Sequence, residues 1–282
     1  MKNLYVVHGG LGKNILFTSL IPSLCKKDGV EKISVMTPWP FIFRYNKQID
    51  GVEPFDRQFG WKLHPHLTKY DNIIYHEPYY SNYIIDENIH MVDDWAQGLD
   101  IEPVINKPYV PIMNIDHGHT FYSISPDETC DPPEKKYCVV QVNGGYGQQG
   151  NNIIIPRDYR LDLVQKLLSK IRNEFDLDVI CFRLETEPKP SDTITFKANT
   201  EDGLLNILPI INDSEFVISI DSSLKHLAAC TDTKTIALYN KTETRPEKIG
   251  YSFQTNLICE NDICIDIDPV DILETIRKEC YG

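Results

Sequence analysis

The chain has 282 residues, 41% of them hydrophobic, and a formal net charge of -13. This length suits two domains of ordinary size or one large one. The acidic balance argues against a generic nucleic-acid-binding protein, and the lack of an 18-residue apolar run argues against a membrane span. Residues 1–70 nevertheless hold ten Lys/Arg and five Asp/Glu, a net of +5, which leaves -18 for the remainder. This excess indicates either an anionic partner or a solvated surface with chance clustering.

The N-terminus and the cysteines indicate the compartment. Met1 and Lys2 lead directly into a short strand, so we expect no signal peptide. None of the eight cysteines forms a C-x-x-C pair, and several lie in apolar segments, which favours reduced, buried thiols. We therefore expect a cytoplasmic protein.

The first part of the chain alternates strand and helix. Residues 3–7 predict a buried strand, and apolar residues at helical spacing predict a helix over 15–24 that Pro22 bends. Two further strands are expected at 32–36 and 71–78, and a short helix at 87–99. Six prolines then interrupt the pattern over 102–136, which predicts a domain boundary, placed at 125/126.

A second alternation follows this proline-rich region. Apolar runs predict four strands, at 137–142, 178–182, 216–220 and 234–239. Helical patterns are expected over 164–175, 203–212, 222–230 and, after a cap at Asp268-Pro269, to about Cys280. Two successive sets of alternating elements predict two parallel-sheet α/β domains, 1–125 and 126–282.

The opening turn "HGGLGKN" lies where the first strand ends and does not fit the common nucleotide-binding motifs. A Walker loop requires a serine or threonine after Gly12-Lys13, but Asn14 has no hydroxyl for magnesium. The dinucleotide pattern G-x-G-x-x-G also fails, because Gly10 and Gly12 lead only to Ile15. The glycines therefore predict a close backbone approach without identifying the ligand.

Two later turns also lie at strand ends, where open parallel sheets bind ligands. They are "NGGYGQQG" after residue 142 and "DSSLKH" after residue 220. Backbone N–H groups opening the helix at Asp221-Ser222-Ser223 would suit an anion such as a diphosphate, with His226 one turn further on. The alternative is an ordinary N-cap at Asp221 or Ser222.

The segment from Ser214 to Tyr251 resembles glycosyltransferase family 9, the heptosyltransferase-like enzymes. The matching positions are Asp221, Ser222, His226, Leu227, Ala228 and Ala229, whereas Ser223 stands where the family usually has glycine. The segment "IALYNKTETRPEKIGY" is similar to the family's next strand and loop, and "IIIPRDYRLDLVQKL" is similar to the start of the first C-terminal helix. The resemblance covers most of the chain in order, with a core of about forty residues.

The resemblance implies a GT-B fold, in which two facing Rossmann-like domains enclose a cleft and the chain ends in a helix. A nucleotide-sugar donor would bind the C-terminal domain and the acceptor the N-terminal domain. Helix N-termini and basic side chains would meet the diphosphate charge, so no cofactor and no metal are expected. The implied donor-binding residues are Gly12, Lys13, Asn14, Gly144, Gly145, Tyr146, Asp221, Ser222, Ser223, His226, Thr242 and Arg245.

The resemblance also exposes a missing group. The family has an aspartate, its proposed general base, where this chain has Lys13. A lysine is a poor base at neutral pH, and we expect Lys13 to stabilise the leaving diphosphate instead. Candidates for the base come from strand ends of the N-terminal domain, and they are His8, Glu77 and Asp94.

The acceptor is less defined. Aromatic and basic residues interleave over 37–83, a mixture that suits a phosphorylated glycan or a nucleic acid with an extruded base. The family resemblance implies a lipopolysaccharide-like glycan as acceptor, and the wider resemblance to GT-B enzymes implies a hydroxymethylated base in viral DNA as the other candidate. The alternative is that at least half of these rings fill the core of the N-terminal domain. A different class of function, a non-catalytic nucleotide-sugar-binding protein derived from a glycosyltransferase, is permitted by the loss of the aspartate. Retention of Asp221, His226 and Arg245 favours the enzyme.

Overall fold

The computed structural model describes residues 2–55, 65–81, 89–102, 107–113, 115, 119–122, 129–144, 157–182, 190–241, 245–261 and 263–282. These residues form two compact units, one of residues 1–111 and 247–249 and the other of 112–246 and 250–282. The division therefore falls near residue 111, whereas the sequence pattern placed it at 125/126. The difference arises because β5 (His119–Tyr122) pairs with β9 (Ile194–Ala198) and so joins the second sheet.

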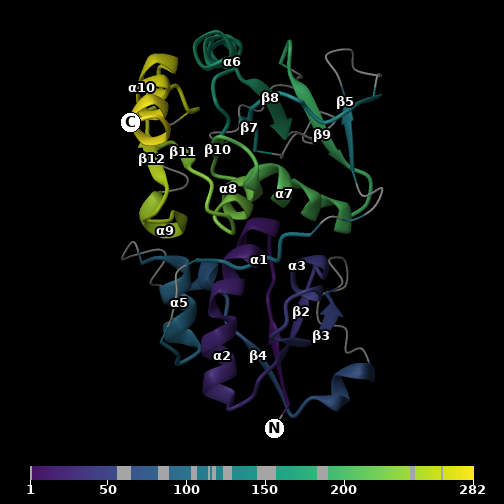
Figure 1. Cartoon of the computed structure of the whole chain (residues 1–282). Helices are drawn as coiled ribbons and strands as arrows, with labels where there is room; N and C mark the ends of the chain where they lie inside the picture. Colours follow the sequence, from purple (N-terminus) through teal and green to yellow (C-terminus); the bar gives the residue numbers. More distant parts are fainter. Residues whose placement is uncertain are drawn as a thin grey trace. The chain divides into compact units, whose positions relative to one another are not determined.

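The first unit is built on a four-stranded parallel sheet in the order β3-β2-β1-β4. The sheet consists of β1 (Asn3–Val6), β2 (Ile33–Thr37), β3 (Ile49–Pro54) and β4 (Asn72–Tyr75). The helical elements are α1 (Leu11–Phe17), η1 (Thr18–Leu20), α2 (Ile21–Asp28), α3 (Phe41–Arg44), η2 (Pro65–Lys69), η3 (Pro78–Tyr80) and α5 (Met91–Gly98) (Figure 1).

Alternate residues of this sheet point to opposite faces. Leu4, Val6 and Met36 form a cluster on one face with residues of η2 and its neighbours. The first helix predicted from the sequence is divided by the 3-10 turn η1, just before Pro22 in the first turn of α2. Proline has no N–H to continue the helical hydrogen bonds, which explains the break.

The second unit contains an eight-stranded sheet in the order β12-β11-β10-β7-β8-β9-β5-β6. In addition to β5 and β9, its strands are β6 (Thr129–Cys130), β7 (Tyr137–Gln141), β8 (Asp178–Phe182), β10 (Val217–Ile220), β11 (Thr235–Tyr239) and β12 (Thr255–Ile258). Its helical elements are α6 (Leu161–Phe175), η4 (Asp202–Asn206), α7 (Ile207–Asn212), α8 (Ser223–Ala228), α9 (Pro246–Ile249) and α10 (Pro269–Cys280). Strands β12 to β9 are parallel, and β5 and β6 add an antiparallel edge.

Helices cover both faces of the second sheet, as in a doubly wound fold. Helices α6 and α10 pack over one face, where Val140, Ile218 and Leu238 are buried beneath them. Helices α7 and α8 pack over the opposite face, against β7 and β10 (Figure 1). Within the described residues, no helix is both long enough and apolar enough to cross a bilayer.

Candidate functional site

Each sheet has one point at which its strand order reverses. In the first sheet β1 is flanked by β2 on one side and β4 on the other, and in the second β7 is flanked by β8 and β10. Loops leave the carboxyl ends of the strands in opposite directions there, which opens a crevice where α/β proteins bind ligands. The side chains at the ends of β1 and β4, and of β7 and β10, are therefore the candidate site residues of their own units.

In the second unit, a hydroxyl and an amide join the ends of β7 and β10. Ser222 follows β10 and occupies the N-cap of α8, yet its side chain does not cap the helix. Its hydroxyl instead donates to Gln141 Oε1 at 2.5 Å, and its oxygen lies 3.1 Å from Ser219 Oγ. The simple N-cap interpretation of Ser222 therefore does not describe its side chain, which fixes the two strand ends against each other.

Asp221, which precedes the cap of α8, is held by a buried cation from that helix. Lys225, fully buried, donates to Asp221 Oδ1 at 2.5 Å and to the Tyr239 hydroxyl at 3.1 Å. Burial disfavours the ammonium, but the Asp221 charge, the Tyr239 phenol and the hydrogen bonds to both outweigh it, so the pKa of Lys225 is raised. Asp221 also lies 3.7 Å from the Arg157 guanidinium and 3.9 Å from His226 Nε2. One buried carboxylate thus organises three cationic or titratable groups behind the strand end.

A backbone amide marks the turn after β7. Gly144 donates its N–H to Asp158 Oδ1 at 2.6 Å. Burial raises the pKa of the Asp158 carboxyl, although the Gly144 N–H, the Asn143 side chain and Arg157 act in the opposite direction. The predicted donor residues Gly145, Tyr146 and Thr242 lie outside the described residues.

The remaining predicted donor residues of this unit differ in exposure. His226 is buried, and its Nδ1 lies 2.6 Å from the Tyr251 hydroxyl, whose pKa burial raises strongly. Ser223 begins α8 and is partly exposed, and Arg245 precedes α9 and is exposed. The structure thus buries Asp221 and His226 beside the partly exposed Ser222 and Ser223, whereas Arg245 is exposed.

In the first unit, the opening loop is fixed from inside. Asn14 is fully buried, donates to the Gly10 carbonyl at 2.9 Å and accepts from the Thr37 hydroxyl at 2.6 Å. The Trp39 indole donates to the Gly9 carbonyl at 2.9 Å. Gly9 has φ +105°, and a Cβ there would lie 3.0 Å from Lys13 Cδ, which explains a glycine at this position. Asn14, predicted to bind the donor, holds the loop to β2.

Lys13 is buried. Its ammonium pairs with Glu77, and it lies over the rings of Tyr79 and Trp95, 4.6 and 5.5 Å from their centroids. Burial lowers the pKa of Lys13, and the charges of Glu77 and Asp94 partly offset this effect. Its partner Glu77 also accepts from Tyr75 and from the Tyr79 N–H, both at 3.2 Å. Gly12 is the second residue of α1 and is half-buried.

The other predicted bases lie near the same strand ends. Asp94 is fully buried on α5, accepts from Ser81 and lies 2.9 Å from His76 Nε2. His8 follows β1, is exposed, and packs edge-on against Phe55 with the ring centroids 5.1 Å apart. The interleaved aromatics are partly core, because Phe41, Phe43, Phe55 and Tyr70 are buried.

Three residues of the candidate site were not predicted from the sequence. Gln141, Lys225 and His76 each owe their place to a partner that is distant in the chain or one helical turn away. Lys225 had a local signal, since it lies only four residues after Asp221 in the chain. Gln141 and His76 lie at strand ends, but only the folded structure supplies their partners.

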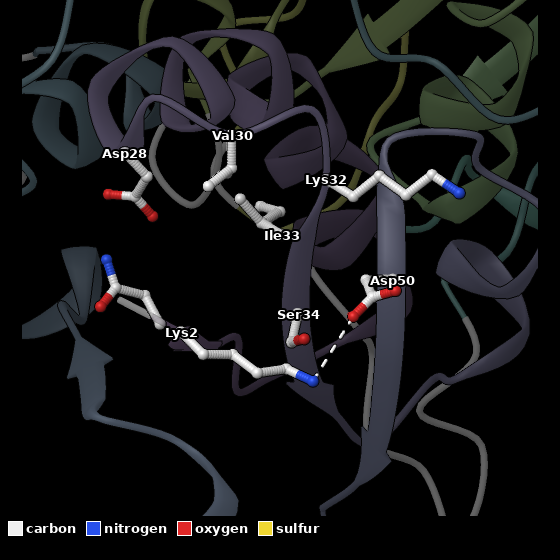
Figure 2. A pocket seen from close by; sticks show the side chains of 8 residues that line it. Lys2, Asp28, Val30, Lys32, Ile33, Ser34 and Asp50 are labelled. Atoms are coloured by element: carbon white, nitrogen blue, oxygen red, sulfur yellow. Dashed lines mark ion pairs between the residues drawn. The ribbon is translucent and has the colours of Figure 1, made fainter.

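A small pocket of about 160 Å³ lies elsewhere in the first unit. It is lined by residues at the amino ends of the strands, among them Asn3, Ser34 and Asp50. Figure 2 shows Lys2 and Asp50 pointing toward each other across it, with their charged atoms 3.4 Å apart. Because ligands of parallel sheets bind at the carboxyl ends, this pocket does not belong to the candidate site.

Both units are Rossmann-like, and each has candidate site residues at the switch point of its sheet. The GT-B fold class predicted from the sequence is confirmed. Residues 201–265 match the sequence profile described as Glycosyltransferase family 9 (heptosyltransferase). This segment runs from η4 through β10, α8 and β12, so it carries Asp221, Ser222 and His226. The predicted resemblance is confirmed there, and it supports a glycosyltransferase enzyme.

Solved structures are similar over nearly the whole chain. The E. coli ADP-heptose lps heptosyltransferase II shares 14% identity over 99% of this chain and 98% of its own, with a TM-score of 0.66. The glycosyl transferase family 9 protein from Veillonella parvula shares 12% identity over 98% of this chain and 88% of its own, with a TM-score of 0.60. The iron-containing dodecameric glycosyltransferase TibC from enterotoxigenic E. coli shares 12% identity over 92% of this chain and 62% of its own, with a TM-score of 0.58. No curated protein sequence matches the chain.

Proposed function

We propose that this protein transfers a sugar from a nucleoside-diphosphate donor to an acceptor hydroxyl. The observation that carries the proposal is that the family match covers β10 and α8 at the switch point of the second sheet. The donor diphosphate would lie against Ser222 and Ser223, with Arg157 supplying positive charge beside Asp221. Lys225 cannot serve the donor directly, because it is fully buried and paired with Asp221.

The acceptor side would lie at the switch point of the first sheet. There the ends of β1 and β4 present His8, the Lys13–Glu77 pair and His76. Tyr79 and Tyr80, 54% and 84% exposed, lie in η3 shortly after β4. Lys13 lies over the Tyr79 ring, and Tyr80 offers the more exposed ring on which a sugar or an extruded base can stack. A lipopolysaccharide-like glycan is the first candidate acceptor, and a hydroxymethylated DNA base is the second.

Lys13 remains a proposed contact of the leaving diphosphate, with one condition added by the structure. Its ammonium is already compensated by Glu77, so meeting a phosphate would require it to share or exchange that carboxylate. Burial lowers the pKa of Lys13, and a nearby phosphate would act in the opposite direction by stabilising the ammonium. Donor binding would thus strengthen the charge of Lys13 and loosen its pairing with Glu77.

We also propose a single displacement with inversion and without a bound metal. The C-terminal part of the sequence has two D-x-D pairs, Asp176–Asp178 and Asp266–Asp268. The first lies at the amino end of β8 and the second at the N-cap of α10, so neither stands at the carboxyl strand ends of the proposed donor site. Since TibC contains iron, the point needs its own test. A chelator should leave the transfer rate unchanged, and a strict metal requirement with stoichiometric metal in the purified protein would refute this part of the proposal.

The experiment combines binding and turnover. Calorimetry with ADP, UDP and GDP, followed by slow hydrolysis of ADP-heptose, UDP-glucose, UDP-N-acetylglucosamine and GDP-mannose, should identify one nucleotide class that is both bound and released. Binding without any hydrolysis or transfer would favour the non-catalytic alternative. Neither binding nor hydrolysis would overturn the proposed function.

A further inference from the structure

The acceptor hydroxyl must lose a proton, and the residues first considered as its base are poorly suited to take it. Asp94 has no exposed surface. Glu77 already accepts from Lys13, Tyr75 and the Tyr79 N–H, so both of its oxygens are engaged by groups of the protein. His8 is exposed and packs against Phe55.

His76 has the position that a base needs. It follows β4, the strand beside β1, and therefore lies at the switch point of the first sheet. Its side chain is 27% exposed, in contrast to its buried partner Asp94. A molecule bound at the ends of these strands can thus approach the imidazole but not the carboxylate.

The imidazole is held in one orientation. Asp94 Oδ2 lies 2.9 Å from Nε2, and the Trp95 indole donates to the His76 carbonyl at 3.1 Å. The ring packs directly on Gly98 of α5, where a Cβ would come within 2.4 Å of the ring. A carboxylate at Nε2 favours the tautomer with the proton on that nitrogen, which leaves the lone pair on Nδ1. This is the arrangement of an oriented general base.

The charged groups at this strand end come from three elements. Asp94 from α5 and Glu77 from the cap of η3 supply two carboxylates, whereas Lys13 from α1 supplies one ammonium. Burial together with Glu77 raises the pKa of Tyr75 to about 12. Asp94 is the carboxylate in direct contact with the His76 ring.

We propose that His76 is the general base of the transfer reaction and that Asp94 is its positioning residue. The proposal rests on the proposed glycosyltransferase function. The acceptor O–H proton moves to Nδ1 while the acceptor oxygen forms a bond to the anomeric carbon. The bond from that carbon to the diphosphate oxygen breaks, and its electron pair leaves with the nucleoside diphosphate. The base is thus supplied by the end of β4 instead of the position of Lys13.

The test uses hydrolysis of the panel donor that the wild-type chain cleaves fastest, with water as acceptor, between pH 5 and 9. We expect His76→Ala to lower kcat by about 100-fold or more, within the 10²–10⁴ typical of general-base catalysis. The acidic limb of the pH profile should disappear, KM should change little, and added imidazole should restore much of the rate. His90→Asn is the matched control, because His90 accepts from Val92 as the N-cap of α5 and asparagine caps equally well.

The outcomes separate the two proposals. Hydrolysis by the wild type together with an unchanged rate and acidic limb in His76→Ala would overturn the base assignment alone. Loss of activity without rescue by imidazole would also count against it, as expected of a merely structural residue. If His76→Ala does not fold, His76→Gln, which can still donate to Asp94, should fold and show the same lost limb. A wild type that hydrolyses no donor would overturn both proposals.

Discussion

The ammonium of Lys225 lies 2.5 Å from Asp221 Oδ1, and neither side chain is more than 5% exposed. The pair links α8 to the end of β10, directly behind the proposed donor site. The two residues are only four positions apart in the chain, and the turn from β10 into α8 brings the two groups together.

Removing one member of this pair should be costly. Lys225→Met leaves a buried carboxylate without its closest cation and should lower the free energy of unfolding by about 3–5 kcal/mol. Urea unfolding monitored by circular dichroism measures the loss. Asp221→Asn combined with Lys225→Met should be more stable than Lys225→Met alone.

The exposed pair of Lys241 and Glu260 is the matched control, since it has the same 2.5 Å separation but side chains 58% and 84% exposed. Lys241→Met should cost no more than about 1 kcal/mol. Equal losses in the free energy of unfolding for Lys225→Met and Lys241→Met would show that burial does not set the cost of breaking the Asp221–Lys225 pair.

The network that fixes the opening loop should also show in stability. Thr37→Val keeps the shape of the side chain but removes the hydroxyl that donates to Asn14 and accepts from the Trp39 N–H at 3.0 Å. Leaving these buried groups unsatisfied should cost about 1–3 kcal/mol, measured as a lower midpoint of unfolding. Thr275→Val on α10, whose hydroxyl bonds only to the Asp271 carbonyl among the described contacts, should change little. An unchanged midpoint in Thr37→Val would contradict the network.

The buried carboxyl of Asp158 should make the stability of the protein depend on pH. Burial raises the pKa of its carboxyl in the folded state. Its contribution to stability is therefore fully present below the unfolded pKa, near 4, and is lost as the pH rises through the raised folded value. Asp158→Asn keeps an oxygen for the Gly144 N–H but cannot ionise, so its stability relative to wild type should rise from pH 3 to pH 7. A difference that stays constant or falls over this range would contradict the assignment.

Much of the fold follows from the sequence, and the exceptions have a common cause. The strands with strong apolar runs, such as β7, β10 and β11, were predicted because burial on both faces requires continuous apolar residues. β3 and β12 were missed because they are edge strands of mixed polarity, and β3 contains Gly51 and ends at Pro54. β5 and β9 become recognisable only through their pairing, which joins His119 to Ala198.

The candidate site shows the same division. The strand-end residues Asp221 and Glu77 could be predicted because the carboxyl ends of parallel strands are where ligands bind. Their partners could not, because Ser222 meets Gln141 and His76 meets Asp94 only after the strands and helices have assembled. The burial of Lys13 likewise depends on the rings of Tyr79 and Trp95, which no local pattern brings to it.

The central claim is that a nucleoside diphosphate binds the second unit at the ends of β7 and β10. Amide hydrogen exchange read by mass spectrometry, with and without saturating ADP, UDP or GDP, tests it most directly. The nucleotide that binds by calorimetry should slow exchange in peptides covering Ser219 to Leu227 and the turn after Gln141, because ligand contacts at these amides suppress local opening. The pocket at the amino ends of the first sheet, beside Lys2 and Asp50, should show no change. Tight nucleotide binding that leaves exchange across β10 and α8 unaltered would contradict the account.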